Sequence, residues 1–390
     1  MLIFHPMYSR IHRGRTARRL FAFALFGMMF VLVQCPNPAS GPKSYVYVSN
    51  ATSNDVSAFV LDLDNGTLTA ANGSPFPVGA ASSPNAVAAN PAGTLVFVAE
   101  YGPGKVGVFF VGAGGSLTQV ANSPFASGAN TYDVRVDPSG RWLYAANDGA
   151  ANVSGFSIDA ATGALSGLSN SPYGAGIDPS YTAVAPSGQF AYVANEADGT
   201  VSGYSVTNGV LSSLGSAAPL LASNTGATFP YAVVVDPSGK YLYSANSGTD
   251  GVSALSINGA GGLSIVTNSP FSSGTGSSPY SLAIDPKGRF LYVADTGTAS
   301  VSAFTIAASG PSAGQLTAIP GSPFAAGTSP DVVAVDPTST YLFAGNSQSN
   351  NLSMYTITQS GPNAGALTQV QGSPFMTGTN PNGIAITPPK

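Results

Sequence analysis

Tyr45-Val-Tyr-Val-Ser-Asn50 introduces a hexapeptide pattern that the chain repeats six more times. The other copies are Leu95-Val-Phe-Val-Ala-Glu100, Trp142-Leu-Tyr-Ala-Ala-Asn147, Phe190-Ala-Tyr-Val-Ala-Asn195, Tyr241-Leu-Tyr-Ser-Ala-Asn246, Phe290-Leu-Tyr-Val-Ala-Asp295 and Tyr341-Leu-Phe-Ala-Gly-Asn346. Successive copies start 50, 47, 48, 51, 49 and 51 residues apart. Short strand-like runs that recur at this period indicate a propeller or a solenoid.

One repeat, residues 230–275, shows how the pattern folds. Its apolar and alternating runs predict strands at 231–235, 241–245, 252–257 and 263–266. The first two are separated by Asp236-Pro-Ser-Gly239, in which Pro pre-sets φ and Gly permits positive φ, as a tight turn requires. Four antiparallel strands per repeat are typical of a propeller blade.

The two ends of the repeat array predict how the ring closes. The array begins at Tyr45 with a strand of the second type, and it ends at 383–386 with a strand of the first type. The C-terminal strand should therefore join the three N-terminal strands in one blade and leave no open sheet edge. We predict an all-β, seven-bladed β-propeller over residues 45–390.

The N-terminal segment has the features of an export signal, which we assign to residues 1–34. Five arginines precede the apolar run 20–33, which is shorter than the roughly 20 residues that span a bilayer. Cys35 follows, as in a lipoprotein signal, and would carry the lipid at the start of a tether, 35–44. The alternatives are an uncleaved anchor and cleavage near Ala39 or Ser40. We expect a bacterial protein outside the cytoplasm, in the envelope or secreted.

Composition excludes several classes of function. Charged residues make up 8% of the chain. Without the five arginines of the predicted signal, the chain has 8 Lys and Arg and 17 Asp and Glu, which gives a net charge of −9. Such a chain has no basic surface for nucleic acid. The only histidines are His5 and His12, so the expected mature protein has no histidine for acid–base catalysis or metal binding. We expect a monomer without metal or other cofactor, and the single cysteine permits no disulfide within the chain.

The repeat unit resembles a known family. Val235-Asp-Pro-Ser-Gly-Lys-Tyr-Leu-Tyr243, followed by Ala245-Asn246 and Val252-Ser-Ala-Leu-Ser-Ile257, is similar to repeats of lactonase-type seven-bladed propellers. That group includes bacterial phosphogluconolactonases, fungal muconate cycloisomerases and surface proteins with Tyr-Val-x-Asn repeats. The resemblance covers residues 45–388 and implies the same fold. It implies lactone hydrolysis only weakly, because one fold serves many functions.

The chain departs from the family at the place where phosphogluconolactonases carry Gly-Pro-Arg-His before an inner strand. The corresponding stretches here are Phe229-Pro-Tyr-Ala232, Ser278-Pro-Tyr-Ser281, Ser329-Pro-Asp-Val332 and Asn380-Pro-Asn-Gly383. None contains Arg or His. No functional residue of the family can therefore be assigned to this chain.

Candidate site residues are those at which the repeats differ along the inner strands. Counted back from the proline of each first turn, positions −5 and −3 should face the central channel. Position −3 is small and apolar in six repeats but is Arg135 in the third, and Asp133 occupies position −5 on the same strand. The two are either an ion pair that neutralises itself or a device that orients a polar ligand. Tyr181 is the aromatic residue at position −5.

Position −6 should ring one mouth of the channel. Its members are Asn85, Tyr132, Ser180, Tyr231, Tyr280, Asp331 and Asn382. Tyrosines, amides and a carboxylate could bind a sugar-like ligand, or the tyrosines could simply pack against neighbouring loops. At the same mouth the second strands end in Asn, except that Glu100 and Asp295 replace it. These acids are either substitute turn caps or candidate general bases.

Two functions remain after these exclusions. The first is an envelope protein that binds a small polar or sugar-like ligand, or a protein partner, without catalysis. The alternative is a hydrolase of a sugar lactone, in which Glu100 or Asp133 acts as the base and Arg135 stabilises the oxyanion. The missing histidines and the missing family motif favour the binding protein at the level of sequence.

Overall fold

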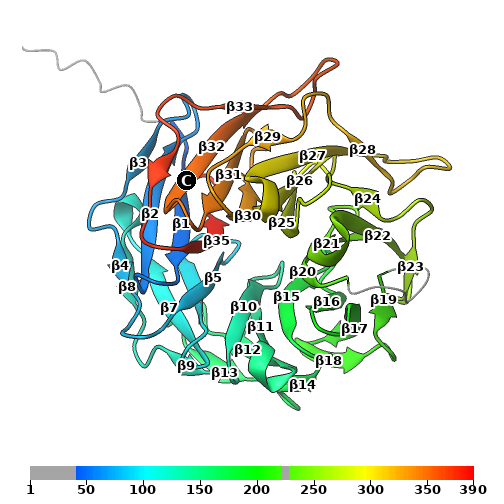
Figure 1. The fold of residues 1–390 in the computed structure, drawn as a ribbon. Coiled ribbons are helices and arrows are strands. Elements are labelled where there is room, and N and C mark those ends of the chain that lie inside the picture. The colour runs from blue at the N-terminus through cyan, green and yellow to red at the C-terminus, as the bar shows by residue number, and fades with distance from the viewer. Residues whose placement is uncertain (1–40, 221–227) are drawn as a thin grey trace, which may run out of the picture. The chain divides into compact units, whose positions relative to one another are not determined.

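The computed structural model describes residues 41–220 and 228–390. The predicted export signal 1–34, the candidate lipid attachment site Cys35 and most of the predicted tether lie outside the described residues. Within the described ranges, no helix has the length and apolar character needed to cross a membrane. Residues 41–390 form one unit, a ring of seven antiparallel sheets around a central axis (Figure 1).

The first-type runs form the inner strands that surround the axis. These are β35 (Pro381–Ile386), β5 (Pro84–Ala89), β10 (Thr131–Val136), β15 (Pro179–Val184), β20 (Pro230–Val235), β25 (Pro279–Ile284) and β30 (Pro330–Val335). The repeated hexapeptides form the second strands. These are β1 (Lys43–Asn50), β6 (Leu95–Glu100), β11 (Trp142–Asn147), β16 (Phe190–Asn195), β21 (Tyr241–Asn246), β26 (Phe290–Asp295) and β31 (Tyr341–Asn346).

Two further strands complete each predicted four-stranded blade. The third strands are β2 (Asp55–Asp62), β7 (Lys105–Val111), β12 (Asn152–Ile158), β17 (Thr200–Thr207), β22 (Gly251–Ile257), β27 (Ser300–Ile306) and β32 (Asn351–Ile357). The outer strands are β3 (Leu68–Ala70), β8 (Leu117–Gln119), β13 (Leu165–Gly167), β18 (Val210–Ser213), β23 (Leu263–Ile265), β28 (Leu316–Ala318) and β33 (Leu367–Gln369).

Each blade also has a two-residue fifth strand that the repeat pattern did not predict. It pairs with the third strand beside the outer strand. The seven are β4 (Phe76–Pro77), β9 (Phe125–Ala126), β14 (Tyr173–Gly174), β19 (Ala218–Pro219), β24 (Phe271–Ser272), β29 (Phe324–Ala325) and β34 (Phe375–Met376). In six blades it follows a Ser whose hydroxyl accepts a hydrogen bond from a third-strand N–H, as Ser123 Oγ does from Val108 (2.8 Å). Four 3₁₀ turns occur among the described residues, η1 (Ala113–Gly115), η2 (Asp148–Ala150), η3 (Ser247–Thr249) and η4 (Thr296–Thr298).

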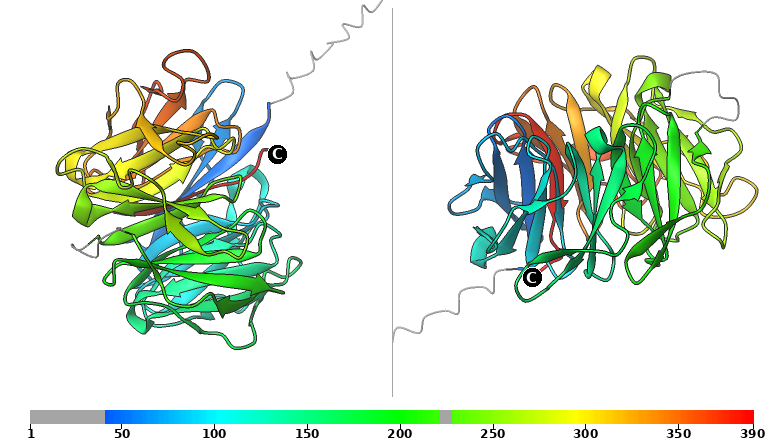
Figure 2. Two further views of the ribbon diagram at one scale, coloured as in Figure 1. Left: turned by 90° about the vertical axis from the view of Figure 1, so that its right-hand side faces the viewer. Right: turned by 90° about the horizontal axis from the view of Figure 1, so that it is seen from below.

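The hydrophobic core lies between the blades. Each of its clusters joins two neighbouring sheets, as Leu95 and Phe97 of one blade pack with Leu143 and Phe156 of the next. The views from the side show the blades stacked face to face around the ring (Figure 2). Strand alternation produces this arrangement, because each second strand buries residues on both faces, one toward each neighbour.

The ring closes as the sequence predicts. β35, the last strand, pairs with β1 in the register Val46↔Ile386 and Val48↔Ile384. The same sheet contains β2 and β3, so one blade combines both ends of the described unit. Beyond β35, the backbone of Lys390 exchanges two hydrogen bonds with Lys43 (3.1 and 2.9 Å).

Candidate functional site

A β-bulge shapes one mouth of the channel, because every inner strand has its second residue unpaired. In β10, Thr131 pairs with Asn147 and Asp133 pairs with Ala146, which leaves Tyr132 between them. Strict alternation would turn Tyr132 toward the blade core with Val134. The bulge instead redirects this position to the channel. Six of the seven bulge residues line a central cavity, namely Asn85, Tyr132, Tyr231, Tyr280, Asp331 and Asn382.

Ser180 is the exception among these bulge residues. Its hydroxyl donates to the carbonyl oxygen of Pro230 at 3.1 Å, and its side chain is buried. We call the six lining residues the tyrosine mouth. The structure thus brings together residues from six different blades that occupy the same position, −6, in the repeats.

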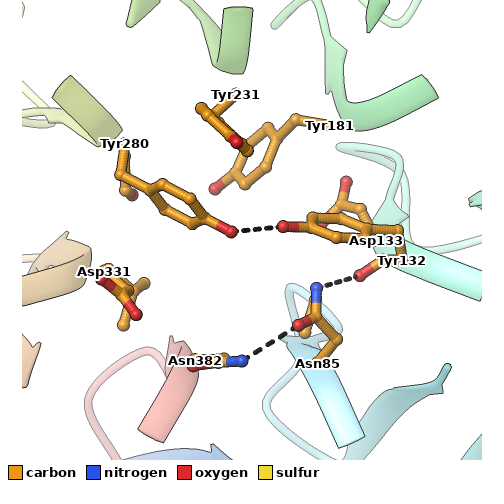
Figure 3. Close-up of a pocket in the computed structure, with 11 residues that line it drawn as sticks. Asn85, Tyr132, Asp133, Tyr181, Tyr231, Tyr280, Asp331 and Asn382 are labelled. Atoms are coloured by element: carbon orange, nitrogen blue, oxygen red, sulfur yellow. Dashed lines mark hydrogen bonds between the residues drawn. The ribbon is translucent and has the colours of Figure 1, made fainter. Parts of the chain in front are cut away.

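Two tyrosines of this mouth reach toward each other across the channel (Figure 3). The hydroxyl groups of Tyr132 and Tyr280 lie 2.5 Å apart and share a hydrogen bond. Their strands β10 and β25 are on opposite sides of the ring, so the bond crosses the channel. The rings of Tyr231 and Tyr280 are stacked, with centroids 4.2 Å apart. Burial raises the pKa of Tyr280 to about 12, so this phenol stays protonated and can donate at neutral pH.

The space enclosed by the tyrosine mouth is small. Its cavity volume is about 30 Å³, which is enough for a water molecule but not for a sugar ring. A ligand as large as a sugar ring must therefore rest against the outer side of the Tyr132–Tyr280 pair. The enclosed space has room only for a water-sized reactant.

Amides and a carboxylate form the other side of the mouth. Asn382 Nδ2 donates to Asn85 Oδ1 (3.1 Å), and Asn85 Nδ2 donates to the carbonyl oxygen of Tyr132 (2.9 Å). Asn382 Oδ1 is buried without a hydrogen-bond partner among the described residues. An unpaired buried acceptor is costly, so this oxygen is ready for a donor such as a hydroxyl group or water.

Asp331 is the only bulge residue that is a carboxylate. Its Oδ1 lies 3.2 Å from the hydroxyl oxygen of Thr296, which is also 2.9 Å from the carbonyl oxygen of Pro330. Burial raises its pKa, while hydrogen bonds from Ser347 and Thr296 lower it. Asp331 remains partly exposed, so it combines contact with the cavity and raised basicity, which suits a general base.

The predicted pair of Asp133 and Arg135 is present. Asp133 and the predicted Tyr181 line the same small cavity as the tyrosine mouth, and Arg135 lies deeper in the channel. Arg135 Nε donates to Asp133 Oδ2 (3.2 Å), and Arg135 Nη2 is 3.1 Å from Asp133 Oδ1. Asp133 Oδ2 also accepts from the backbone N–H of Thr182 (2.8 Å), and the carboxylate is fully buried. Arg135 stacks over the ring of Tyr181, 3.9 Å from its centroid. Burial raises the pKa of Asp133, and the guanidinium opposes that effect.

Glu100 and Asp295 do not join the tyrosine mouth, since neither lines its cavity. Asp295 Oδ2 accepts from Ser302 on the third strand of its own blade at 2.5 Å. The equivalent Asn147 donates to Ser154 in the same place at 2.9 Å. This is the geometry of a substitute cap. Burial raises the pKa of Asp295, and likewise that of Glu100, to about 7.

Glu100 fits because its blade lacks the serine that the other third strands carry. Gly107 stands there, and a Cβ at Gly107 would be only 2.7 Å from Glu100 Oε1. Glu100 is 3% exposed, and Lys105 pairs with it in the register. It is therefore enclosed within one blade and separate from Asp133 and Arg135.

Acidic residues outside the predicted set surround the tyrosine mouth. Tyr101 OH donates to Asp148 Oδ2 (3.1 Å), and its ring meets Tyr132 edge-on at 6.0 Å. Glu196 lies beside Tyr231 and raises the pKa of that phenol together with burial. These residues share one sequence position, immediately after the last residue of a second strand. A comparison of the repeats at this position would have identified Tyr101, Asp148 and Glu196 as candidate site residues.

The comparisons with known proteins identify the family. A model of the seven-bladed β-propeller lactonases matches residues 39–322 and 281–381. The chain therefore belongs to the lactonase family of seven-bladed β-propellers. No curated protein matches it in sequence.

Solved structures share the fold at low identity. A Bacteroides uniformis protein provisionally assigned as a 6-phosphogluconolactonase has 17% identity and a TM-score of 0.74, covering 88% of this chain and 99% of its own. A similarly assigned Bacteroides fragilis protein has 16% identity and a TM-score of 0.75, covering 90% and 99%. The periplasmic gluconolactonase of Pseudomonas aeruginosa has 16% identity and a TM-score of 0.67, covering 88% and 99%.

Proposed function

We propose that the protein hydrolyses an uncharged sugar lactone at the tyrosine mouth. The observation that carries this proposal is the placement of Asp331 beside a water-sized cavity at the mouth of a lactonase-family propeller. The low-identity neighbours described as lactonases support it. Together they favour the hydrolase over the binding protein that the sequence alone favoured.

In this mechanism the lactone ring rests on the outer side of the tyrosine pair. Two hydroxyl groups that share one hydrogen bond retain one free O–H between them. That proton can bond to the lactone carbonyl oxygen and stabilise the negative charge that develops there. The unpaired Asn382 Oδ1 can accept from a hydroxyl group of the sugar or from the attacking water.

Asp331 then acts on the water held in the cavity. The water oxygen forms a bond to the acyl carbon while Asp331 takes its proton. The ring C–O bond breaks as the tetrahedral intermediate collapses, and the alkoxide leaving group takes the proton from Asp331. The product is an open-chain hydroxy acid, and the carboxylate is returned to its starting state.

The charge around the mouth selects against phosphorylated substrates. Asp331, Glu196 and Asp148 lie on or beside the mouth, and the only guanidinium that the described residues place in the nearby channel is paired with Asp133. A phosphate group would meet negative charge without a free cation. The ionised product is repelled in the same way, which favours its release.

The decisive experiment measures hydrolysis of glucono-1,5-lactone above the spontaneous rate, beside its 6-phosphorylated counterpart. We expect turnover of the neutral lactone, slower turnover of the phosphorylated one, and a loss of about 10²–10⁴-fold in kcat for Asp331→Asn. Activity should fall as pH decreases through a pKa above the ordinary value of 3.8. This follows because a general base must be ionised.

Two acids provide matched controls. Asp64→Asn changes an exposed hairpin carboxylate, and Glu100→Gln changes a carboxylate buried inside a blade. Both should retain native turnover. Full activity of Asp331→Asn, or rates equal to the spontaneous reaction in every folded sample, would contradict the proposal.

A further inference from the structure

The opposite end of the channel contains a second, larger cavity. Here the inner strands end, and the cavity has a volume of about 430 Å³, adjoining another of about 250 Å³ deeper in the channel. Arg135 and Tyr181 line both. We call this region the wide cavity. Its volume lies in the range of small-molecule sites, and it is reached from the face opposite the tyrosine mouth.

The wall of the wide cavity is mixed, because polar and apolar atoms contribute to it in nearly equal measure and the apolar side chains come from two positions of the inner strands. Position −3 supplies small side chains such as Ala183 and Val234, and position −2 supplies Val136, Val184 and Ile386. The polar side chains at its rim are already used. Asp137 accepts from the backbone N–H groups of Arg141 and Trp142 (2.9 and 2.8 Å). In the equivalent turn, Asn90 Oδ1 accepts from the backbone N–H of Thr94 (2.8 Å).

One charged group inside the wide cavity retains bonding capacity. Arg135 Nε donates to Asp133 Oδ2, Nη2 lies 3.1 Å from Asp133 Oδ1, and the guanidinium is also hydrogen-bonded to Tyr181. A guanidinium has five N–H groups, so Arg135 keeps donors for a ligand. The side chain of Arg135 is 27% exposed. Thr182 also borders the cavity, but it stands at position −4 and is 1% exposed, so its side chain faces the neighbouring blade and Arg135 is the group available to a ligand.

The charge of the pair decides which ligand the guanidinium suits. Arg135 is already neutralised by the buried Asp133, so a ligand carboxylate would leave a net negative charge in a poorly solvated site. An uncharged oxygen acceptor can take the remaining guanidinium N–H bonds without that penalty. An apolar body can cover the valines and alanines.

We propose that the wide cavity is a binding site for a small uncharged amphipathic molecule. Its carbonyl or hydroxyl oxygen accepts from the guanidinium of Arg135, and its hydrocarbon body lies along the part of the wall formed by Val184 and Val234. Asp133 and Tyr181 also line the small cavity of the tyrosine mouth, so the two sites adjoin along the channel. The wide cavity uses an ion pair to which the proposed hydrolysis assigns no role.

Calorimetric titration with a homologous series of primary amides tests the proposal. Octanamide should bind with one-to-one stoichiometry and more tightly than hexanamide, by about threefold to fourfold per methylene group. Octanoate, with the same chain and a charged head, should bind at least tenfold more weakly than octanamide. No binding of octanamide, equal affinity across the series, or tighter binding of octanoate would each overturn the proposal.

Variants locate the site. Val234→Phe, which fills the cavity, and the charge-neutral double variant Asp133→Asn with Arg135→Gln should each weaken octanamide at least tenfold. Thr118→Phe adds the same ring to the exposed outer strand β8 and should leave the affinity unchanged. Melting curves and gel filtration verify folding, and Val184→Phe replaces Val234→Phe if the latter does not fold. Native affinity in the folded cavity-filling variants would place the binding elsewhere and refute the proposal.

Discussion

Asp295, which replaces the usual Asn at the end of its second strand, should make the folding stability of the protein depend on pH. Asp295 is completely buried, and its Oδ1 has no hydrogen-bond partner among the described residues. Its pKa rises from 3.8 to about 7, first because burial penalises the charge. Between those pH values the unfolded chain has lost the proton while the folded chain retains it. Stability therefore falls as pH rises across this interval, and the loss is complete above about pH 7.

Asp295→Asn should remove this loss, because an amide does not titrate and can donate to Ser302 as Asn147 donates to Ser154. We expect a gain of about 1–3 kcal/mol at pH 8 and little change at pH 4. Chemical denaturation at several pH values measures it. Glu100, with its pKa also raised to about 7, should leave a residual slope that Glu100→Gln flattens further. An unchanged stability profile in Asp295→Asn would contradict this account.

At the scale of elements, a tyrosine in the second strand connects five of the seven blades to the outer hairpin of the following blade. Tyr243 OH donates to the carbonyl oxygen of Gly314 at 3.0 Å, and the same bond is made in the other four blades by Tyr47, Tyr144, Tyr192 and Tyr292. These side chains are fully buried. In these five blades the tyrosine at the third position of the hexapeptide does more than pack, because its hydroxyl satisfies a buried backbone oxygen; Phe97 and Phe343 take the position in the other two.

Tyr243→Phe should destabilise the protein by about 1–2 kcal/mol, because the ring still packs but the Gly314 carbonyl oxygen loses its donor. The matched control is Tyr241→Phe, two residues earlier in β21 (Tyr241–Asn246) and partly exposed. It should change the free energy of unfolding by less than about 0.5 kcal/mol. Equal effects of the two substitutions in denaturant titrations would show that the interblade hydrogen bond contributes nothing.

The sequence predicts the repeated features of the molecule better than the singular ones. Seven copies of one pattern predict seven blades, and strand alternation correctly placed Asp133 and Arg135 on one face of β10. The bulge that turns Tyr132 into the channel is invisible to alternation. The bond from Tyr132 to Tyr280 joins strands on opposite sides of the ring, so it depends on the closed ring rather than on any local pattern.

Ring closure is the property on which the whole molecule depends. β35 (Pro381–Ile386) pairs with β1 and packs between two blades, since Ile384 contacts one interblade cluster and Ala385 the other. It also carries Asn382 into the tyrosine mouth. Removing residues 380–390 would expose the edge of β1 and open both clusters to solvent.

We expect the chain truncated after residue 379 to lose its cooperative melting transition and to aggregate, although only 11 of 390 residues are missing. A circular permutant provides the control. Residues 380–390 are placed before residue 41 through a short linker, which is feasible because Lys43 and Lys390 are hydrogen-bonded neighbours. This permutant restores the missing strand and should recover the native melting temperature and monomeric elution. A truncated chain that melts like the full-length protein would show that six complete blades and one open blade are enough to hold the ring.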